Sequence, residues 1–278
     1  MFCRIPGTIG LAVMALFAAA LLGVPHSAHA ELKPQRIPVD GVAREALVHL
    51  PAGQEPVPLV FVFHGHGGNA VKAAEQYGFQ NFWPEAATIY MQGLPTPIPT
   101  DPEGKKSGWQ MTRGGQGDRD LKFFDAALKR MKSLRAIDTR RVYAIGFSNG
   151  GFFSYVLWSA RRDQLAAIAM GGCIYHPKAG ELQPLPCLHL AGKDDDLIPL
   201  ARQQESMERI RQVNGCDAVG KRWVEHPKIV STYFKSAKQA PFVSVICPVG
   251  HEVPKVTGFA ATKFFKEHSR PEVKKPGA

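Results

Sequence analysis

The stretch that decides the fold is Val142–Ala160, which reads VYAIGFSNGGFFSYVLWSA. An apolar run typical of a buried strand leads into the pattern G-x-S-x-G, and a helix-like apolar segment follows at once. In this context the pattern predicts a nucleophile elbow, a sharp turn that lifts Ser148 out of the sheet. Gly146 and Gly150 allow the strand and the helix to approach each other closely beneath it. Ser148 is therefore the candidate nucleophile.

Strand-like and helix-like segments alternate along the rest of the chain. The strand-like runs lie at Ala46–Leu50, Leu59–Phe63, Ala87–Met91, Val142–Phe147, Leu165–Met170, Leu188–Ala191 and Phe242–Cys247. Several are continuously apolar, as parallel strands buried on both faces are. Helical patterns lie at Leu121–Met131, Ser206–Val213 and Phe259–Phe265. This alternation predicts an α/β fold with a mostly parallel sheet, helices on both faces, and one catalytic domain over residues 31–268.

Both ends of the chain differ from the rest in composition. Residues 1–30 contain Arg4, then an almost wholly apolar run, and then Ala28-His29-Ala30, which together are typical of a cleaved secretory signal peptide. Residues 269–278 are rich in Pro and Lys and are predicted to form a disordered basic tail. We therefore expect a secreted protein, extracellular or periplasmic, that has no membrane anchor once the signal peptide is removed.

The chain is basic, with a formal net charge of +10. Its Lys and Arg residues are scattered, apart from a modest cluster at Lys263, Lys266, Arg270, Lys274 and Lys275. Scattered charge of this kind favours solubility and loose attraction to acidic surfaces. We therefore do not expect a nucleic-acid partner.

Export to an oxidising compartment bears on how the cysteines are interpreted. Cys3 lies in the predicted signal peptide, so the exported chain would keep Cys173, Cys187, Cys216 and Cys247. An even set in such a compartment predicts at least one disulfide, and the sequence leaves the pairing open. A bond between Cys173 and Cys187 is disfavoured, because a strand separates the sheet edges where the two are expected.

A serine nucleophile needs a base that removes its proton. His251 follows the strand-like run Phe242–Cys247, which places it at the sheet edge where Ser148 also emerges. His189 lies inside a strand-like run and is interpreted as a core side chain. His251 is therefore the candidate base.

The base in turn needs a carboxylate that orients it. Asp194, Asp195 and Asp196 follow the strand-like run Leu188–Ala191, and any of the three could reach the imidazole. Nucleophile, acid and histidine then occur in the chain order that this kind of elbow uses. On the residues alone, the choice among the three aspartates stays open.

Donors for an oxyanion are expected from the backbone. The sequence HGHGG at residues 64–68 follows a strand-like run, as a loop that offers an N–H beside the nucleophile does. The N–H groups of His66 and Asn149 are the candidate oxyanion hole. Because the backbone acts here, the His66 side chain is given no role.

A competing interpretation assigns the same histidines to a metal. His64 and His66 form an H-x-H pair that the aspartates and His251 could complete as a zinc-type metallohydrolase. The sequence Gly67-Gly68-Asn69 stands where an Asp-His pair would follow, which argues against this interpretation.

The Pro-rich segment Leu94–Gly108 is too long for a simple connector and predicts a surface loop at the edge where open α/β sheets bind ligands. Trp109 follows it directly. Its indole is a candidate substrate-binding platform, and packing is the other interpretation of a Trp at this position.

The segment Ile137–Gly151 resembles, almost letter for letter, the elbow segment of a secreted esterase group within the α/β-hydrolase superfamily. This group contains polyhydroxybutyrate depolymerases and feruloyl and acetylxylan esterases. The similarity runs across most of the chain, from His64 to Pro254. The resemblance implies an α/β-hydrolase fold with Ser148 as the nucleophile and His251 as the base.

The same resemblance selects the acid. Asp195–Pro199 is similar to the D-x-x-V-P of the group, which implies Asp195. Two positions depart from the group: Ala191-Gly192 stands where a His-Gly pair usually precedes the acid, and Val253 stands where a Trp usually follows the histidine. Neither departure changes the triad. The missing Trp affects substrate contacts, because an indole offers a large apolar surface that could hold the substrate.

Together these features lead us to expect a serine esterase that acts through an acyl-serine intermediate and requires no metal or organic cofactor. The expected substrate is an ester of an oligomeric polyester, such as a polyhydroxyalkanoate, or of an acylated plant polysaccharide fragment. The alternatives are an acyltransferase with the same triad and the metallohydrolase described above.

Overall fold

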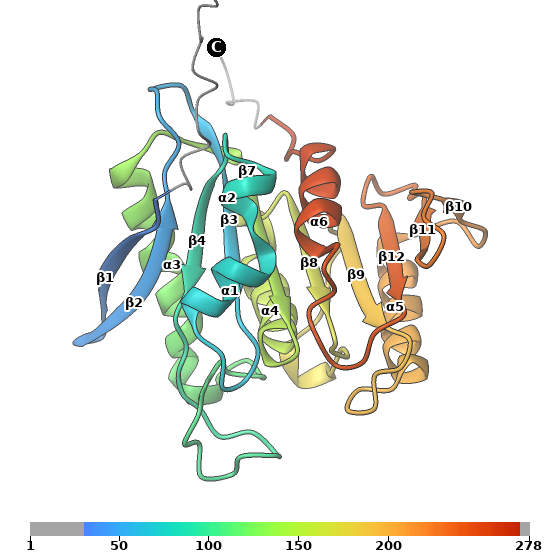
Figure 1. The fold of residues 1–278 in the computed structure, drawn as a ribbon, viewed down its shortest axis with the longest axis horizontal. Helices are drawn as coiled ribbons and strands as arrows, with labels where there is room; N and C mark the ends of the chain where they lie inside the picture. The colour runs from blue at the N-terminus through green and yellow to red at the C-terminus, as the bar shows by residue number, and fades with distance from the viewer. Residues whose placement is uncertain (1–30, 273–278) are drawn as a thin grey trace, which may run out of the picture.

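The central feature of the fold is a ten-stranded sheet (Figure 1). The computed structural model describes residues 31–272. Neighbouring strands β4, β3, β7, β8, β9 and β12 are parallel. Their bounds are Ala87–Met91 (β4), Val57–Phe63 (β3), Ile137–Phe147 (β7), Ala167–Gly171 (β8), Cys187–Gly192 (β9) and Phe242–Cys247 (β12). These strands are largely buried on both faces, which explains their continuous apolar sequences.

Antiparallel strands complete the sheet at both edges. A hairpin of β1 (Lys33–Val39) and β2 (Val42–His49) pairs with β4 on one side. β11 (Val230–Phe234) and β10 (Lys221–Arg222) follow β12 on the other. Asp40 and Gly41 make the turn of the first hairpin with φ of 49° and 80°, as a tight two-residue hairpin turn requires.

Helices cover both faces of the sheet (Figure 1). One face carries α3 (Arg119–Leu134), α4 (Asn149–Arg161) and α5 (Leu200–Asn214), and the other carries α1 (Ala70–Tyr77), α2 (Phe79–Phe82) and α6 (Thr257–Lys266). Short 3-10 helices lie at Gly115–Asp118, Arg162–Gln164 and Pro177–Ala179. The predicted α/β class with a mostly parallel sheet and helices on both faces is confirmed.

The sheet separates two apolar cores, and alternate residues of one strand enter each core. In β3, Phe61 and Phe63 enter the core under α3 and α4, while Val60 and Val62 enter the core under α1 and α6. The Phe61 ring lies 4.5 Å from the Phe124 ring of α3 between centroids. Burial on both sides fixes the register of β3, and therefore the position at which the loop after it leaves the sheet.

The Pro-rich segment before Trp109 differs from the plain surface loop that we predicted. Its two ends pair as the short antiparallel strands β5 (Leu94–Pro95) and β6 (Ser107–Gly108). The segment is therefore a two-stranded arm whose base is fixed by backbone hydrogen bonds.

The predicted disulfide is a further point that the structure corrects, because all four cysteines within residues 31–272 are free. Cys247 belongs to the core beneath α6, whereas Cys173 and Cys187 belong to the core on the opposite face, so the sheet keeps Cys247 from both. Cys216 directs its Sγ toward the carbonyl oxygen of Ala240, 3.8 Å away. Burial raises the pKa of the Cys216 and Cys247 thiols to about 11.

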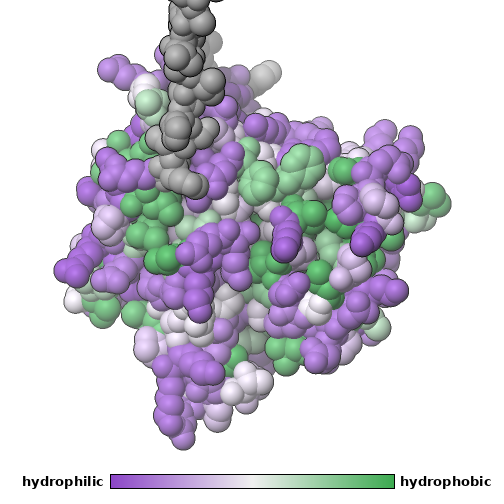
Figure 2. Space-filling model, viewed as in Figure 1, coloured by the Kyte–Doolittle hydropathy of each residue, from purple (hydrophilic) through white to green (hydrophobic). Residues whose placement is uncertain are grey.

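Residues 1–30 and 273–278, and with them the predicted signal peptide and most of the predicted tail, lie outside the described residues. The Arg270 N–H donates to the Arg140 carbonyl at 2.9 Å, so the start of the predicted tail contacts the domain. Between residues 31 and 272, no helix has the length and apolar character that crossing a bilayer requires. Figure 2 shows polar residues interspersed with apolar ones over one face of the molecule. Two of the large apolar side chains, Phe82 at the end of α2 and Phe259 on α6, are half-exposed.

Candidate active site

Ser148 occupies a strained turn between β7 and α4. Its backbone angles, φ 53° and ψ −121°, lie outside the regions that residues other than glycine favour. A methyl group at Gly146 would lie 2.2 Å from the Gly150 oxygen, and one at Gly150 would lie 2.3 Å from the Phe63 oxygen. Only glycine fits at these two positions, so the strand and the helix pack closely and hold the turn.

The structure brings the three predicted residues Ser148, His251 and Asp195 together. The Nε2 atom of His251 lies 2.9 Å from the Oγ of Ser148. The Nδ1 atom of His251 lies 3.0 Å and 2.9 Å from the two carboxylate oxygens of Asp195. These residues follow the carboxyl ends of β7, β12 and β9, which are parallel and therefore end at one edge of the sheet.

Of the three adjacent aspartates, Asp195 alone faces the histidine. Its side chain is fully buried, whereas Asp194 and Asp196 are exposed. The N–H groups of Leu197 and Ile198 donate to Asp195 Oδ1 at 3.1 Å and 2.8 Å. Such donors satisfy the buried carboxylate oxygen and fix its position.

The hydrogen bonds of Asp195 decide which protons His251 carries. An ionised carboxylate only accepts, so the His251 Nδ1–H donates to it. The neutral ring then keeps a lone pair on Nε2, which can accept the proton of the Ser148 hydroxyl. The arrangement is therefore suited to removing that proton.

Close approach of two loops brings the acid and the histidine into contact. A methyl group at Gly192 would lie 2.4 Å from the Gly250 oxygen, so the two loops meet where no side chain intervenes. The Asp194 N–H donates to the Val249 oxygen at 3.0 Å, which fastens the loops together. The ring of Phe147 lies 5.1 Å from that of His251 between centroids and supports it from the elbow side.

The predicted oxyanion donors belong to two backbone segments next to Ser148. Asn149 is the first residue of α4, so its N–H has no acceptor within the helix, and the positive end of the helix dipole lies there. The loop that carries His66 passes close to the serine, since a methyl group at Gly65 would lie 3.6 Å from Ser148 Cβ. N–H groups fixed before a substrate binds can stabilise a developing negative charge.

Trp109 is not the substrate-binding platform that we predicted, because its side chain is fully buried. Its backbone N–H donates to Asn149 Oδ1 at 2.7 Å, and Asn149 Nδ2 donates back to the Trp109 oxygen at 3.1 Å. The indole Nε1–H donates to the His64 oxygen at 2.9 Å. Trp109 therefore ties the start of α4 to the loop after β3, the two segments that carry the predicted oxyanion donors.

The competing interpretation of His64 and His66 as a metal-binding pair does not fit the contacts of the His64 ring. Both ring nitrogens of His64 contact backbone: Nδ1–H donates to the Gly65 oxygen at 2.7 Å, and Nε2 accepts the Gly93 N–H at 3.0 Å. Burial lowers the pKa of His64 to about 4 and keeps the ring neutral. Throughout the part of the chain that the structure describes, no three His, Cys, Asp or Glu side chains gather as metal ligands.

The His66 side chain, to which we gave no role, fastens the two-stranded arm. Its Nε2 lies 3.0 Å from Asp101 Oδ2, and the Lys106 N–H donates to the same oxygen at 2.9 Å. The Lys106 N–H and the His66 contact lower the pKa of the Asp101 carboxyl. Asp101 therefore connects the arm to the loop beside Ser148.

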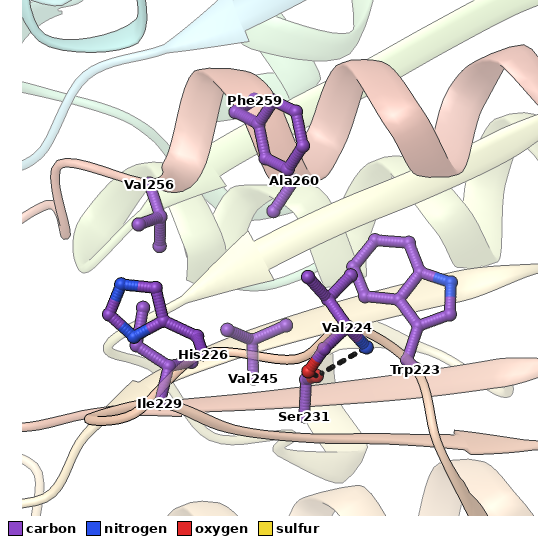
Figure 3. A pocket seen from close by; sticks show the side chains of 9 residues that line it. All are labelled: Trp223, Val224, His226, Ile229, Ser231, Val245, Val256, Phe259 and Ala260. Atoms are coloured by element: carbon purple, nitrogen blue, oxygen red, sulfur yellow. Dashed lines mark hydrogen bonds between the residues drawn. The ribbon is translucent and has the colours of Figure 1, made fainter.

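A separate apolar pocket lies on the sheet face that α6 covers (Figure 3). Its lining comprises Trp223, Val224, His226, Ile229, Ser231, Val245, Val256, Phe259 and Ala260. The Ser231 hydroxyl already pairs with the Val224 backbone at 2.9 Å and 3.0 Å. None of the predicted site residues lines this pocket, so it is distinct from the candidate active site.

Sequence reasoning missed three side chains that support the site: Asp101, the amide of Asn149, and Gln203, which donates to Asp195 at 3.2 Å. None of their supporting contacts follows from a motif. Each contact spans at least eight residues along the chain, so it depends on how the loops fold back.

Comparison with known proteins finds esterases among the relatives of this chain. The chain is 29% identical over 219 residues to a probable feruloyl esterase C of Aspergillus clavatus, covering 74% of this chain and 75% of that protein. It is 29% identical over 178 residues to feruloyl esterase C of Emericella nidulans, covering 62% and 63%. An acetyl xylan esterase structure from Aspergillus awamori shares the fold, with a TM-score of 0.57 and 13% identity over 84% of this chain and 99% of that one.

A sequence model of a family of hydrolases also matches residues 45–218. The match covers more than half of the chain and contains both the elbow and Asp195. The α/β-hydrolase fold that the resemblance implied is thereby confirmed, and the chain belongs to the dienelactone hydrolase family.

Proposed function

We propose that this protein is a carboxylic ester hydrolase that acts through an acyl-serine intermediate. The observation that carries the proposal is the line of contacts from Ser148 Oγ to His251 Nε2, at 2.9 Å, and from His251 Nδ1 to Asp195. The relatives named as feruloyl esterases support the same class of reaction.

In the first half of the reaction, His251 Nε2 takes the Ser148 proton while Oγ attacks the ester carbonyl carbon. The N–H groups of His66 and Asn149 stabilise the resulting oxyanion. When the carbonyl re-forms, the bond to the alcohol oxygen breaks, and the imidazolium gives its proton to that oxygen. Asp195 stabilises the imidazolium while it exists.

The second half releases the acid. His251 takes a proton from water, and the water oxygen attacks the acyl carbon of Ser148. A second oxyanion forms in the same position, and the bond to Oγ then breaks as the serine regains its proton. One ester and one water molecule are consumed, and the products are one carboxylic acid and one alcohol.

For the substrate we propose a small or oligomeric ester of the kind found on acylated plant polysaccharides, with a feruloyl or acetyl group as the acyl part. The names of the sequence relatives and of the acetyl xylan esterase neighbour support this choice. An oligomeric hydroxyalkanoate polyester is the second substrate class to assay. We also propose that the protein is exported, which the composition of residues 1–30 supports.

The test is hydrolysis of 4-nitrophenyl acetate, methyl ferulate and hydroxybutyrate oligomers by the wild-type protein and by Ser148→Ala. We expect activity on at least one ester, lost in the variant, and covalent labelling of Ser148 by a fluorophosphonate. Ser133→Ala, which changes an exposed serine of α3, is the matched control and should keep full activity. A wild-type protein that neither hydrolyses these esters nor reacts with the probe would refute the proposal.

An added alcohol acceptor distinguishes hydrolysis from acyl transfer. If the acyl group appears on the acceptor in preference to water, the acyltransferase alternative is correct. We expect the free acid as the main product at any acceptor concentration that leaves water in large excess.

A further inference from the structure

The carboxylate of Asp195 has a partner that lies beyond its own loop. Gln203, in the first turn of α5, is fully buried, and its Nε2 donates to Asp195 Oδ2 at 3.2 Å. The loop amides of Leu197 and Ile198 both donate to Oδ1. Among the described residues, Oδ2 therefore has two hydrogen-bond donors, His251 and Gln203.

The orientation of the Gln203 amide follows from what surrounds it. Its Nε2 faces two oxygens, Asp195 Oδ2 and the Ile198 carbonyl oxygen at 2.7 Å, and only the NH₂ end can donate to both. A flipped amide would place a third oxygen against them. The Oε1 end therefore faces away from Asp195 and needs a donor of its own.

His189 supplies that donor from the middle of β9. Its Nε2 lies 3.2 Å from Gln203 Oε1, so the ring carries its proton on Nε2. The ring is fully buried, and burial lowers the pKa of His189 to about 4, which keeps it neutral. Among the residues that the structure describes, its Nδ1 has no hydrogen-bond partner, so the contact with Gln203 is the one hydrogen bond of the ring.

We propose that Gln203 and His189 are positioning residues of the esterase site, a proposal that rests on the proposed function. Gln203 fixes the rotation of the Asp195 carboxylate so that both oxygens face His251, and His189 fixes the orientation of the Gln203 amide. The hydrogen bonds form one line from Ser148 through His251, Asp195 and Gln203 to His189. Neither positioning residue contacts the substrate.

This line matters most when His251 becomes positively charged. The imidazolium is stabilised by a carboxylate held in place with its charge directed at Nδ1. Without the Gln203 donor, Oδ2 loses its fixed partner and the carboxylate can rotate away from the ring. The cost then appears in kcat and not in KM, because the imidazolium forms after the substrate has bound.

The first test compares Gln203→Met with two controls in the same helix. Loss of one hydrogen bond to a charged group should lower kcat on 4-nitrophenyl acetate at least about tenfold, with KM unchanged. Asn214→Leu removes another fully buried amide, which pairs with Leu185, and should lower the melting temperature without lowering kcat. Gln212→Met changes an exposed amide and should change neither.

The second test asks whether the two residues act as one unit. His189→Leu should lower kcat several-fold with KM unchanged, and His189→Gln, which can donate to the same oxygen, should restore part of the loss. The double variant Gln203→Met with His189→Leu should be no slower than Gln203→Met alone, because His189 acts only through Gln203. Additive losses would overturn the assigned order.

The third test observes the site by NMR in the absence of turnover. The proton between His251 Nδ1 and Asp195 gives a low-field NMR signal, which is identified by its loss in His251→Ala. We expect this signal to shift or broaden in Gln203→Met and His189→Leu but not in Asn214→Leu. A wild-type protein that hydrolyses esters, with unchanged kcat and an unchanged signal in a folded Gln203→Met, would overturn the inference and leave the proposed function intact. Absence of wild-type hydrolysis would overturn the proposed function instead, and the inference with it.

Discussion

A single methyl group at Gly108 tests whether the proposed oxyanion donors need their observed positions. Gly108 ends β6, and its φ lies outside the left-handed region, so alanine is compatible with the backbone there. The added carbon would lie 2.7 Å from His66 Nδ1 and 2.8 Å from Asn149 Oδ1. The change Gly108→Ala therefore inserts a wedge between the side chains of the two residues whose N–H groups are proposed to hold the oxyanion.

The size of the effect follows from these distances. An ordinary contact of a Cβ atom begins at 3.4 Å, so the two gaps must widen by about 0.7 Å and 0.6 Å. Neither neighbour yields freely, because His66 is held by Asp101 at 3.0 Å and Asn149 is held by Trp109 at 2.7 Å. A shift approaching 1 Å costs up to about 100-fold in rate, so we expect kcat to fall about 10- to 100-fold.

The assay is steady-state hydrolysis of 4-nitrophenyl acetate, with kcat and KM determined separately, together with the melting temperature. KM should stay close to the wild-type value, because the oxyanion forms after the ester has bound. Gly114→Ala is the control from the turn before the 3-10 helix Gly115–Asp118: Gly114 has φ 74° and open space around it. That change should cost about 1 kcal/mol of stability through backbone strain and leave kcat unchanged.

A folded Gly108→Ala protein with wild-type kcat would refute the reasoning. It would show that the arm relaxes without moving the donors, or that His66 and Asn149 do not stabilise the oxyanion. A rise in KM at constant kcat would also count against the assignment, because it would place the methyl group in the path of the substrate.

Three further changes test other parts of the site. Asp195→Asn should lower kcat by about 10,000-fold, because the amide favours the wrong tautomer of the histidine, while Asp194→Asn should have little effect in the same assay. Trp109→Phe removes the donor to the His64 carbonyl but keeps a buried ring, so chemical denaturation should report a loss of about 1–3 kcal/mol, with several-fold lower kcat. Iodoacetamide should alkylate Cys216 first, since it is the least buried thiol, and burial raises its pKa to about 11. The labelling rate should therefore rise about tenfold per pH unit from pH 8 upward, and a thiol titration that finds no free cysteine would contradict the reduced state.

The parallel core of the fold could be predicted because its strands are buried on both faces and read as unbroken apolar runs. The strands β4 and β12 have the bounds that the pattern predicted, Ala87–Met91 and Phe242–Cys247. The edge strands escaped prediction, since β1 is largely exposed and contains Pro34 and Pro38. Edge positions tolerate such sequences because one side of the strand forms no ladder.

The candidate site likewise contains residues that the sequence could predict and residues that it could not. Residues at the carboxyl ends of parallel strands must converge, so chain order and strand ends were enough to propose Ser148 and His251. The choice of Asp195 among its neighbours came from a resemblance, because three adjacent carboxylates differ only in which way their side chains face. The burial of Trp109 and the reduced state of Cys247 depend on packing between distant segments, which no local pattern encodes.

The strained backbone of Ser148 connects the fold to the proposed chemistry. A residue in this conformation costs about 1–3 kcal/mol, and the surrounding packing must offset that cost. The close approach of β7 and α4 at Gly146 and Gly150 offsets this cost, because it holds the turn beneath Ser148. The buried amide of Gln203 holds the Asp195 carboxylate, and the buried amide of Asn149 holds the start of α4 against Trp109. Because these contacts already hold the catalytic groups in the geometry that the reaction needs, little reorganisation is left for the reaction itself. Selectivity among esters must then come from residues around the acyl and alcohol groups, and not from movement of the catalytic groups.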